Sequence, residues 1–305
     1  MTVKRFSSYS RRVIGAKFTA IITSVIMAAA CSDIAEDRRL IPTDTTVPTD
    51  TTEVNPNADL DSLYDAPADS VPRRLLIEDF TGQKCANCPD ASDNIHQLQQ
   101  IYGALIVPVA IQSEFMGIME PEGLGNELGN RYFNAINLTP KVKPALQVSR
   151  FYGDVLTSNT DVNFYVENAI MLKTSTDIRL KTIQNADDHT KADIDVKVIC
   201  TDREGAVSGN LQVWVVEDSI VAPQDYLNGQ HFDDYVHNHV LRASANGDWG
   251  ESIGTVTADE AKEFHYSIDL LPNWNVEHLA IVAFVYDSEQ VSQVVRQQLR
   301  LRTEH

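Results

Sequence analysis

The feature that most constrains the fold of this chain is a close pair of cysteines, Cys85 and Cys88, in the segment CANCP. Residues 75–80, LLIEDF, precede the pair and predict a short, apolar-rich strand. Pro89 suits the first turn of a helix, and residues 105–111 predict a second buried strand. Helical spacing of apolar residues follows the pair, at Ala91, Ile95, Leu98 and Tyr102. The cysteines are therefore expected at the junction between a strand and a helix.

This position gives the two cysteines different chemical roles. Cys85 would lie at a helix N-terminus, where unpaired N–H groups and the helix dipole favour a thiolate. Cys88 would be placed to resolve a mixed disulfide formed by Cys85. An inert structural disulfide is the alternative, since a close pair oxidises readily outside the cytoplasm. A zinc half-site is disfavoured because the sequence has no second Cys or His pair at zinc spacing.

The first 30 residues read as a removable secretory signal. They have a basic start, and an uncharged run, residues 18–30, ends directly at Cys31. This run is shorter than the roughly 20 residues that a membrane-spanning helix needs. The small residues before Cys31 resemble a lipobox, although that pattern prefers Leu where Ala28 stands. The resemblance implies that Cys31 is lipidated and anchors the mature chain in a membrane; an ordinary secreted protein is the alternative.

Residues 31–72 are expected to form a disordered acidic tether, because they are rich in Thr, Pro and acids and poor in apolar side chains. The whole chain has 25 basic and 43 acidic residues, and five of the basic residues lie in the leader. Such an acidic surface repels nucleic acid, so no nucleic-acid partner is expected. Three acids soon after Cys31 resemble the surface-export signal of Bacteroidetes-type lipoproteins: Asp33, Glu36 and Asp37.

Residues 73–174 resemble the strand–CxxC–helix core of thioredoxin-like proteins. That resemblance implies a buried acid at Asp79, either a proton relay or only a polar residue at the strand edge, and a cis-proline facing the cysteines, for which Pro144 is the stronger candidate and Pro140 the weaker. The sequence departs from thioredoxin at Lys84, where the family has Trp, and at the two residues between the cysteines. These departures affect the expected redox potential and the substrate surface.

Residues 175–305 predict a second, all-β domain. Apolar and polar residues alternate over residues 192–200, and Cys200 falls on the inward face as a buried, unpaired thiol. Further strands are expected at residues 211–216, 264–270, 279–286 and 291–301. The predicted fold class is thus an α/β thioredoxin-like domain followed by an all-β immunoglobulin-like sandwich.

The connection from His231 to Glu251 is predicted to be a long loop. It holds two close histidines, His237 and His239, which would share a face if the segment were extended. No third ligand is fixed by spacing, so the favoured interpretation is a hydrogen-bonded loop without metal. We predict that the isolated protein carries no stoichiometric zinc or copper and needs no cofactor; one ion per chain by elemental analysis would contradict this.

The segments HNHVLRASANGDWGE and LAIVAFVYD, together with the TG–CxxCP segment, resemble the Omp28-related outer-membrane lipoproteins of Bacteroidetes. The resemblance covers roughly residues 73–301. It implies a lipid-anchored outer-membrane protein, in either the periplasmic or the surface leaflet, with envelope or host proteins as partners. Two functions stay open: thiol–disulfide exchange through Cys85 and Cys88, or non-enzymatic surface binding or adhesion with these cysteines as a staple.

Overall fold

A computed structural model describes residues 71–258 and 260–302. These residues belong to one compact unit. The predicted leader, Cys31 and all but the last two residues of the predicted tether lie outside the described residues.

The first part of the described chain contains three strands and three helices. They are β1 (Leu75–Thr81), α2 (Cys88–Tyr102), β2 (Ile106–Gln112), α3 (Glu127–Ala135), β3 (Ala145–Val148) and α4 (Asn159–Ala169). The strand, helix and strand predicted around the cysteines are confirmed. All seven residues of β1 are buried, as expected from a strand that is covered on both faces.

The second part is built from strands. They are β4 (Thr176–Gln184), β5 (Lys191–Cys200), β6 (Ala206–Glu217), β7 (Ile220–Tyr226), β8 (Gln230–His237), β9 (Val240–Ser244), β10 (Glu251–Thr257), β11 (Ala261–Asp269), β12 (Leu279–Tyr286) and β13 (Val291–Gln298). Strand β5 alternates between buried and half-buried residues as predicted, and Cys200 is a buried free thiol.

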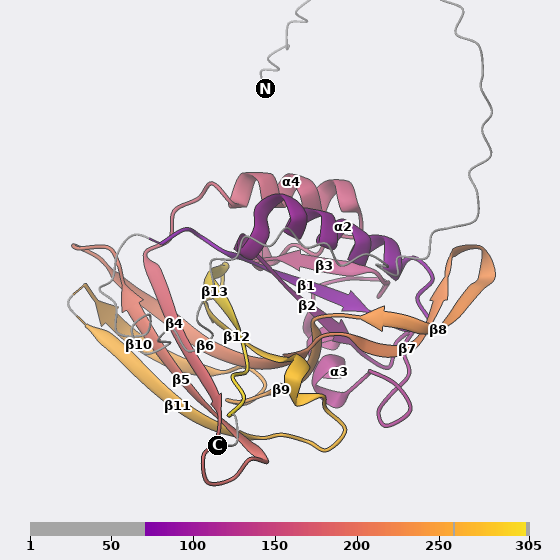
Figure 1. Cartoon of the computed structure of the whole chain (residues 1–305). Helices are drawn as coiled ribbons and strands as arrows, with labels where there is room; N and C mark the ends of the chain where they lie inside the picture. The colour runs from indigo at the N-terminus through magenta and orange to yellow at the C-terminus, as the bar shows by residue number, and fades with distance from the viewer. Residues whose placement is uncertain (1–70, 259, 303–305) are drawn as a thin grey trace, which may run out of the picture. The chain divides into compact units, whose positions relative to one another are not determined.

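The predicted fold class, a thioredoxin-like domain followed by an immunoglobulin-like sandwich, is wrong. Strands from both parts of the chain form one eight-stranded sheet in the order β13-β12-β6-β9-β2-β1-β3, with β10 paired to β6 (Figure 1). The two parts join where β2 runs parallel to β9, at Ala110 and Val240. The Ala110 N–H donates to the His239 carbonyl at 2.8 Å. The sheet is mixed, and the region of the cysteines is one end of it.

Packing explains why the sheet is continuous. One core cluster combines Leu76 and Val109 from the first part with Trp214, Leu241 and Phe284 from the second, and all five are at most 1% exposed. Burial of such large apolar side chains stabilises by roughly 1.5–3 kcal/mol each. Separating the two parts would expose this core to water.

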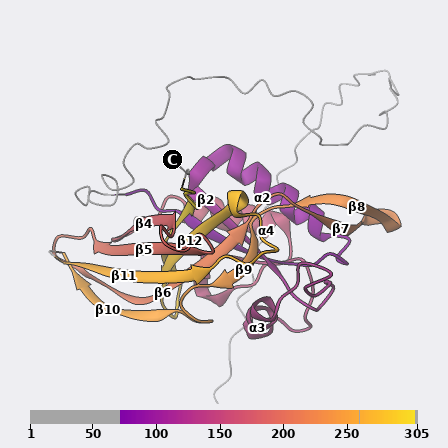
Figure 2. The same cartoon turned by 60° about the horizontal axis from the view of Figure 1, so that its bottom comes forward.

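The layers on the sheet differ between its ends. Helices α2 and α4 pack on one face of β1 and β3, and α3 packs on the opposite face (Figures 1 and 2). At the other end, a three-stranded sheet, β11-β5-β4, packs against β6, β10 and β12. This second arrangement is a two-layer β-sandwich, which agrees with the β-rich packing predicted for that part.

The segment from His231 to Glu251, predicted as a long loop, contains two strands: the end of β8, up to His237, and all of β9. Strands β7 and β8 form a hairpin that is a sheet of its own among the described residues.

No helix within residues 71–258 and 260–302 has the length and apolar character needed to cross a membrane.

Candidate functional site

Cys85 and Cys88 form a disulfide at the N-terminus of α2. Each cysteine is only 1% exposed. The Cys88 N–H donates to the Cys85 carbonyl at 3.1 Å, so the CxxC segment turns directly into the helix. Lys84, directly before Cys85 in the sequence, is exposed. The cysteines thus lie where the sequence predicts them, under a cover that the sequence did not indicate.

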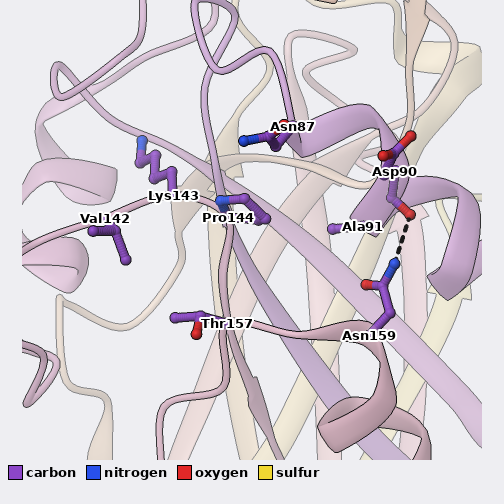
Figure 3. Close-up of a pocket in the computed structure, with 8 residues that line it drawn as sticks. All are labelled: Asn87, Asp90, Ala91, Val142, Lys143, Pro144, Thr157 and Asn159. Atoms are coloured by element: carbon purple, nitrogen blue, oxygen red, sulfur yellow. Dashed lines mark hydrogen bonds between the residues drawn. The ribbon is translucent and has the colours of Figure 1, made fainter. Parts of the chain in front are cut away.

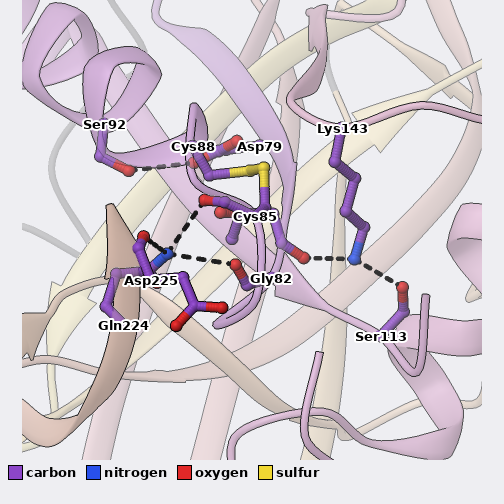
Figure 4. The surroundings of a disulfide bond; sticks show 10 residues. Asp79, Gly82, Cys85, Cys88, Ser92, Ser113, Lys143, Gln224 and Asp225 are labelled. Atoms are coloured by element: carbon purple, nitrogen blue, oxygen red, sulfur yellow. Dashed lines mark hydrogen bonds between the residues drawn. A yellow bond between two sulfur atoms is a disulfide. The ribbon is translucent and has the colours of Figure 1, made fainter. Parts of the chain in front are cut away.

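Asp79 lies beneath the first turn of the helix. It comes from β1, is 3% exposed, and accepts a hydrogen bond of 3.5 Å from the Ser92 hydroxyl, one helical turn beyond Cys88 (Figure 4). Its second oxygen is buried without a hydrogen-bond partner. Burial raises the pKa of Asp79 to about 7, against the opposing attraction of Lys143 and the Ser92 bond. This carboxyl can therefore hold or release a proton near neutral pH.

Lys143 is a site residue that sequence reasoning missed. Its side chain is buried, donates to the Ser113 hydroxyl at 2.7 Å and to the Thr81 carbonyl, and lies 4.9 Å from the Phe133 ring centre (Figure 4). Burial lowers the pKa of Lys143 to about 7, although Asp79 favours its charged form. The only available signal was a lysine directly before the candidate proline.

Pro144 follows Lys143 through a cis peptide bond and precedes β3. It lines an open pocket of about 340 Å³ together with Asn87, which stands between the two cysteines (Figure 3). Across the pocket, the Asn159 amide donates to the Asp90 carbonyl at 3.2 Å. The structure therefore brings Pro144 to the CxxC segment, and the pocket borders both.

The loop after β2 reaches the turn before the cysteines. The Lys84 N–H donates to the Met116 carbonyl at 2.8 Å. A Cβ on Gly82 would lie 2.3 Å from the same Met116 oxygen, so only glycine allows this approach. This close contact buries one side of the CxxC segment.

The β7–β8 hairpin covers another side, from more than 130 residues further along the chain. The Gln224 amide donates to the Cys85 carbonyl at 3.1 Å and the Gly82 carbonyl at 3.3 Å (Figure 4). The Asp225 N–H donates to the Gln83 carbonyl at 2.7 Å. Sequence reasoning missed Gln224, because its position beside the cysteines depends on the hairpin alone.

The three histidines of this region have different surroundings and share no partner. His231 is exposed and interacts with Asp225 at 2.7 Å. His237 is buried, which lowers its pKa to about 4. His239 has a positive φ and pairs with Asp218 at 2.9 Å. The shared face considered for His237 and His239 is therefore not formed, and no cluster of three metal-ligating side chains exists among the described residues.

The fold and the site define a mainly β protein with a buried CxxC disulfide at one end of its main sheet. The family model described as outer membrane protein Omp28 matches residues 130–302, more than half of the chain. The chain therefore belongs to the Omp28 family and is an outer-membrane protein. No curated protein matches it by sequence.

Two solved structures are similar to the chain. HBP35 of Porphyromonas gingivalis is 15% identical, with a TM-score of 0.59 over 78% of this chain and 80% of that one. At this identity the likeness shows the fold alone. A domain of the outer membrane lipoprotein Omp28 from Porphyromonas gingivalis is 25% identical, with a TM-score of 0.32, over 43% of this chain and 92% of that one.

Proposed function

We propose that this outer-membrane protein carries out thiol–disulfide exchange on envelope proteins through Cys85 and Cys88. The observation that carries the proposal is Asp79: a buried carboxyl beneath the first turn of α2, with one oxygen unpaired and a pKa of about 7. A purely structural disulfide does not require a buried acid, which costs stability whenever it is charged. A proton acceptor that titrates near neutral pH is what thiol activation requires.

The exchange is balanced as follows. In the reduced protein, the Cys85 thiolate attacks a disulfide of the substrate protein, and one substrate sulfur leaves as a thiolate. Asp79 accepts the proton of Cys88, whose thiolate then attacks Cys85 in the mixed disulfide. The second substrate sulfur leaves as a thiolate and the Cys85–Cys88 disulfide forms. The substrate disulfide is reduced as the pair is oxidised, and an envelope dithiol would return the pair to its reduced form.

Pro144 and the pocket beside it support substrate contact. The pocket lies between the CxxC segment and the chain before β3, and Val142 on its rim is 37% exposed. Five of the eight lining residues are polar, and such a groove can take an extended protein segment, whose main chain supplies hydrogen-bond donors and acceptors.

The alternative function is non-enzymatic surface binding or adhesion, with the disulfide as a staple. The burial of both cysteines, at 1% exposure each, favours this alternative. A staple would resist reduction, because structural disulfides have potentials below about −300 mV.

Redox titration of the full-length protein against glutathione separates the two. Exchange predicts a potential within about −120 to −270 mV and mixed disulfides captured from intact cells by Cys88→Ser. Cys200→Ser is the matched control, since Cys200 is a buried thiol outside the site. A pair that stays oxidised throughout the glutathione range would refute exchange and favour the staple.

We also propose that Cys31 carries the lipid anchor. The support is the small residues and uncharged run that precede it, together with the family's outer-membrane location. Mass spectrometry of the mature N-terminus should find acyl chains on Cys31, and Cys31→Ser should release the protein from membranes. An unmodified Cys31 in the membrane-bound protein would contradict the proposal.

A further inference from the structure

We infer that the β7–β8 hairpin is a movable cap on the Cys85–Cys88 disulfide, held in the position that an extended segment of the substrate protein occupies during exchange. The inference rests on the proposed exchange function, because a staple needs no access. A movable cap explains how cysteines that are nearly closed to solvent can still react, with a titrating acid beside them.

The hairpin contacts the CxxC loop as an extended peptide would. The backbone N–H of Asp225 donates to the backbone carbonyl of Gln83 at 2.7 Å. In return, the Gln83 side-chain amide donates to the Pro223 carbonyl at 3.0 Å. Main-chain contacts of this kind do not depend on the side chain of the bound segment. Any extended segment that displaced residues 223–225 could therefore take over the bond to Gln83.

The side chain of Gln224 holds this cap closed. It is 2% exposed, and its amide donates to the carbonyls of Cys85 and Gly82. These two carbonyls belong to the turn that presents the disulfide, so Gln224 binds the turn itself. In Figure 4 the Gln224 amide lies directly between them. Opening the hairpin breaks these bonds and leaves the carbonyls to water or to a partner.

Tyr235 extends the cover to the side of Asp79. Its side chain is half-buried, and burial raises its pKa to about 12, with further increases from the negative charges of Asp93 and Asp79. The interaction with Asp79 places the β8 strand near the acid as well as near the cysteines. Opening the hairpin would therefore hydrate Asp79 and uncover the disulfide together.

Three features of the hairpin favour its local opening. It pairs with no other strand among the described residues, and an isolated two-stranded hairpin is only marginally stable in water. Most of β8 is exposed, and the tip turns through Asn228 and Gly229, both with positive φ. Local opening of such an element costs less free energy than opening of the central strands.

The test is the rate at which a small phosphine reductant reduces Cys85–Cys88 in the full-length protein, followed by thiol labelling. We expect Gln224→Ala to speed reduction about tenfold or more, since two buried hydrogen bonds that hold the closed state are lost. Gln230→Ala is the matched control, because Gln230 is an exposed glutamine on the same hairpin. Its reduction should proceed at the wild-type rate.

A second measurement guards against general unfolding. The free energy of unfolding of Gln224→Ala should fall only by the equivalent of the change in reduction rate, about 1.4 kcal/mol for tenfold, and the Asp225 amide should still exchange with solvent much faster than the amides of β1. Reduction of Gln224→Ala at the wild-type rate would overturn the cap. So would Asp225 exchange as slow as that of β1 in the wild-type protein. The equilibrium potential against glutathione is measured separately: it decides the exchange function, whereas the rates decide the cap.

Discussion

Replacing Asp79 by asparagine should remove a loss of stability that this carboxyl causes between pH 5 and pH 7. The pKa of this carboxyl is raised from 3.8 to about 7 in the folded protein, chiefly by burial. The folded state therefore retains a proton that the unfolded state has released. The contribution of Asp79 to stability is most favourable below its unfolded pKa and falls as the pH rises towards 7. Each pH unit between the two values costs about 1.4 kcal/mol.

The window from pH 5 to pH 7 isolates this contribution. It spans about two units, so Asp79 should lower the free energy of unfolding by roughly 3 kcal/mol across it. Lys143, whose pKa is lowered to about 7, is protonated in both states below that pH, and its cost stays constant there. Above pH 7 the Lys143 contribution has the opposite sign, since its folded form has already lost the proton.

Urea unfolding of the oxidised, full-length protein at pH 5 and pH 7 measures the effect. The wild type should lose roughly 3 kcal/mol relative to Asp79→Asn between these pH values. Asp90→Asn serves as the control, because Asp90 is an exposed acid in the first turn of the same helix. Parallel pH profiles for wild type and Asp79→Asn would refute the assignment of Asp79 as a buried, proton-holding acid.

Three further experiments test the packing of the described residues. Arg150→Met should lower the free energy of unfolding by about 3–5 kcal/mol in chemical denaturation, because Glu78, 2% exposed and 2.7 Å from Arg150, is left buried without its partner. Adding Glu78→Leu should restore most of this loss. Cys200 should react with iodoacetamide only after unfolding, and labelling in the native protein would contradict its burial. Gly82→Ala should destabilise by about 1–3 kcal/mol and speed disulfide reduction, because its Cβ would displace the Met116 carbonyl; an unchanged melting temperature would argue against this contact.

The sequence predicted the elements whose burial produces a clear pattern. Strand β1, helix α2 and strand β5 each show a run or a period of apolar residues, and all three were found where expected. The buried acid at Asp79 was implied by the resemblance to thioredoxin-like proteins, and the structure buries it at 3% exposure. The three elements are local features, and local periodicity is sufficient to specify them.

The continuous sheet could not be predicted in the same way. Strands β2 and β9 are far apart in the sequence and meet through a single residue pair, Ala110 and Val240. No pattern in either segment identifies its partner, because both read simply as buried strands. The two-domain prediction followed from a real change of periodicity near residue 177, but such a change does not reveal that both parts share a core.

The hairpin escaped prediction for a different physical reason. Strand β8 is exposed at six of its eight positions, so apolar and polar residues do not alternate along it. Its acids and histidines are typical of a loop. Gln224 and Lys143, which bond the disulfide turn and the neighbouring loop, likewise have no local signature, because each depends on a contact across the fold.

The range of the family match bears on which properties the chain shares with its relatives. Residues 130–302 include Lys143, Pro144 and the whole β7–β8 hairpin, whereas Cys85 and Cys88 precede them. Membership therefore supports the outer-membrane location. The redox proposal depends on the cysteines and Asp79 of this chain, outside the matched range. Thiol chemistry is thus a property to be tested on this protein directly, with the hairpin as the element that determines when its disulfide can react.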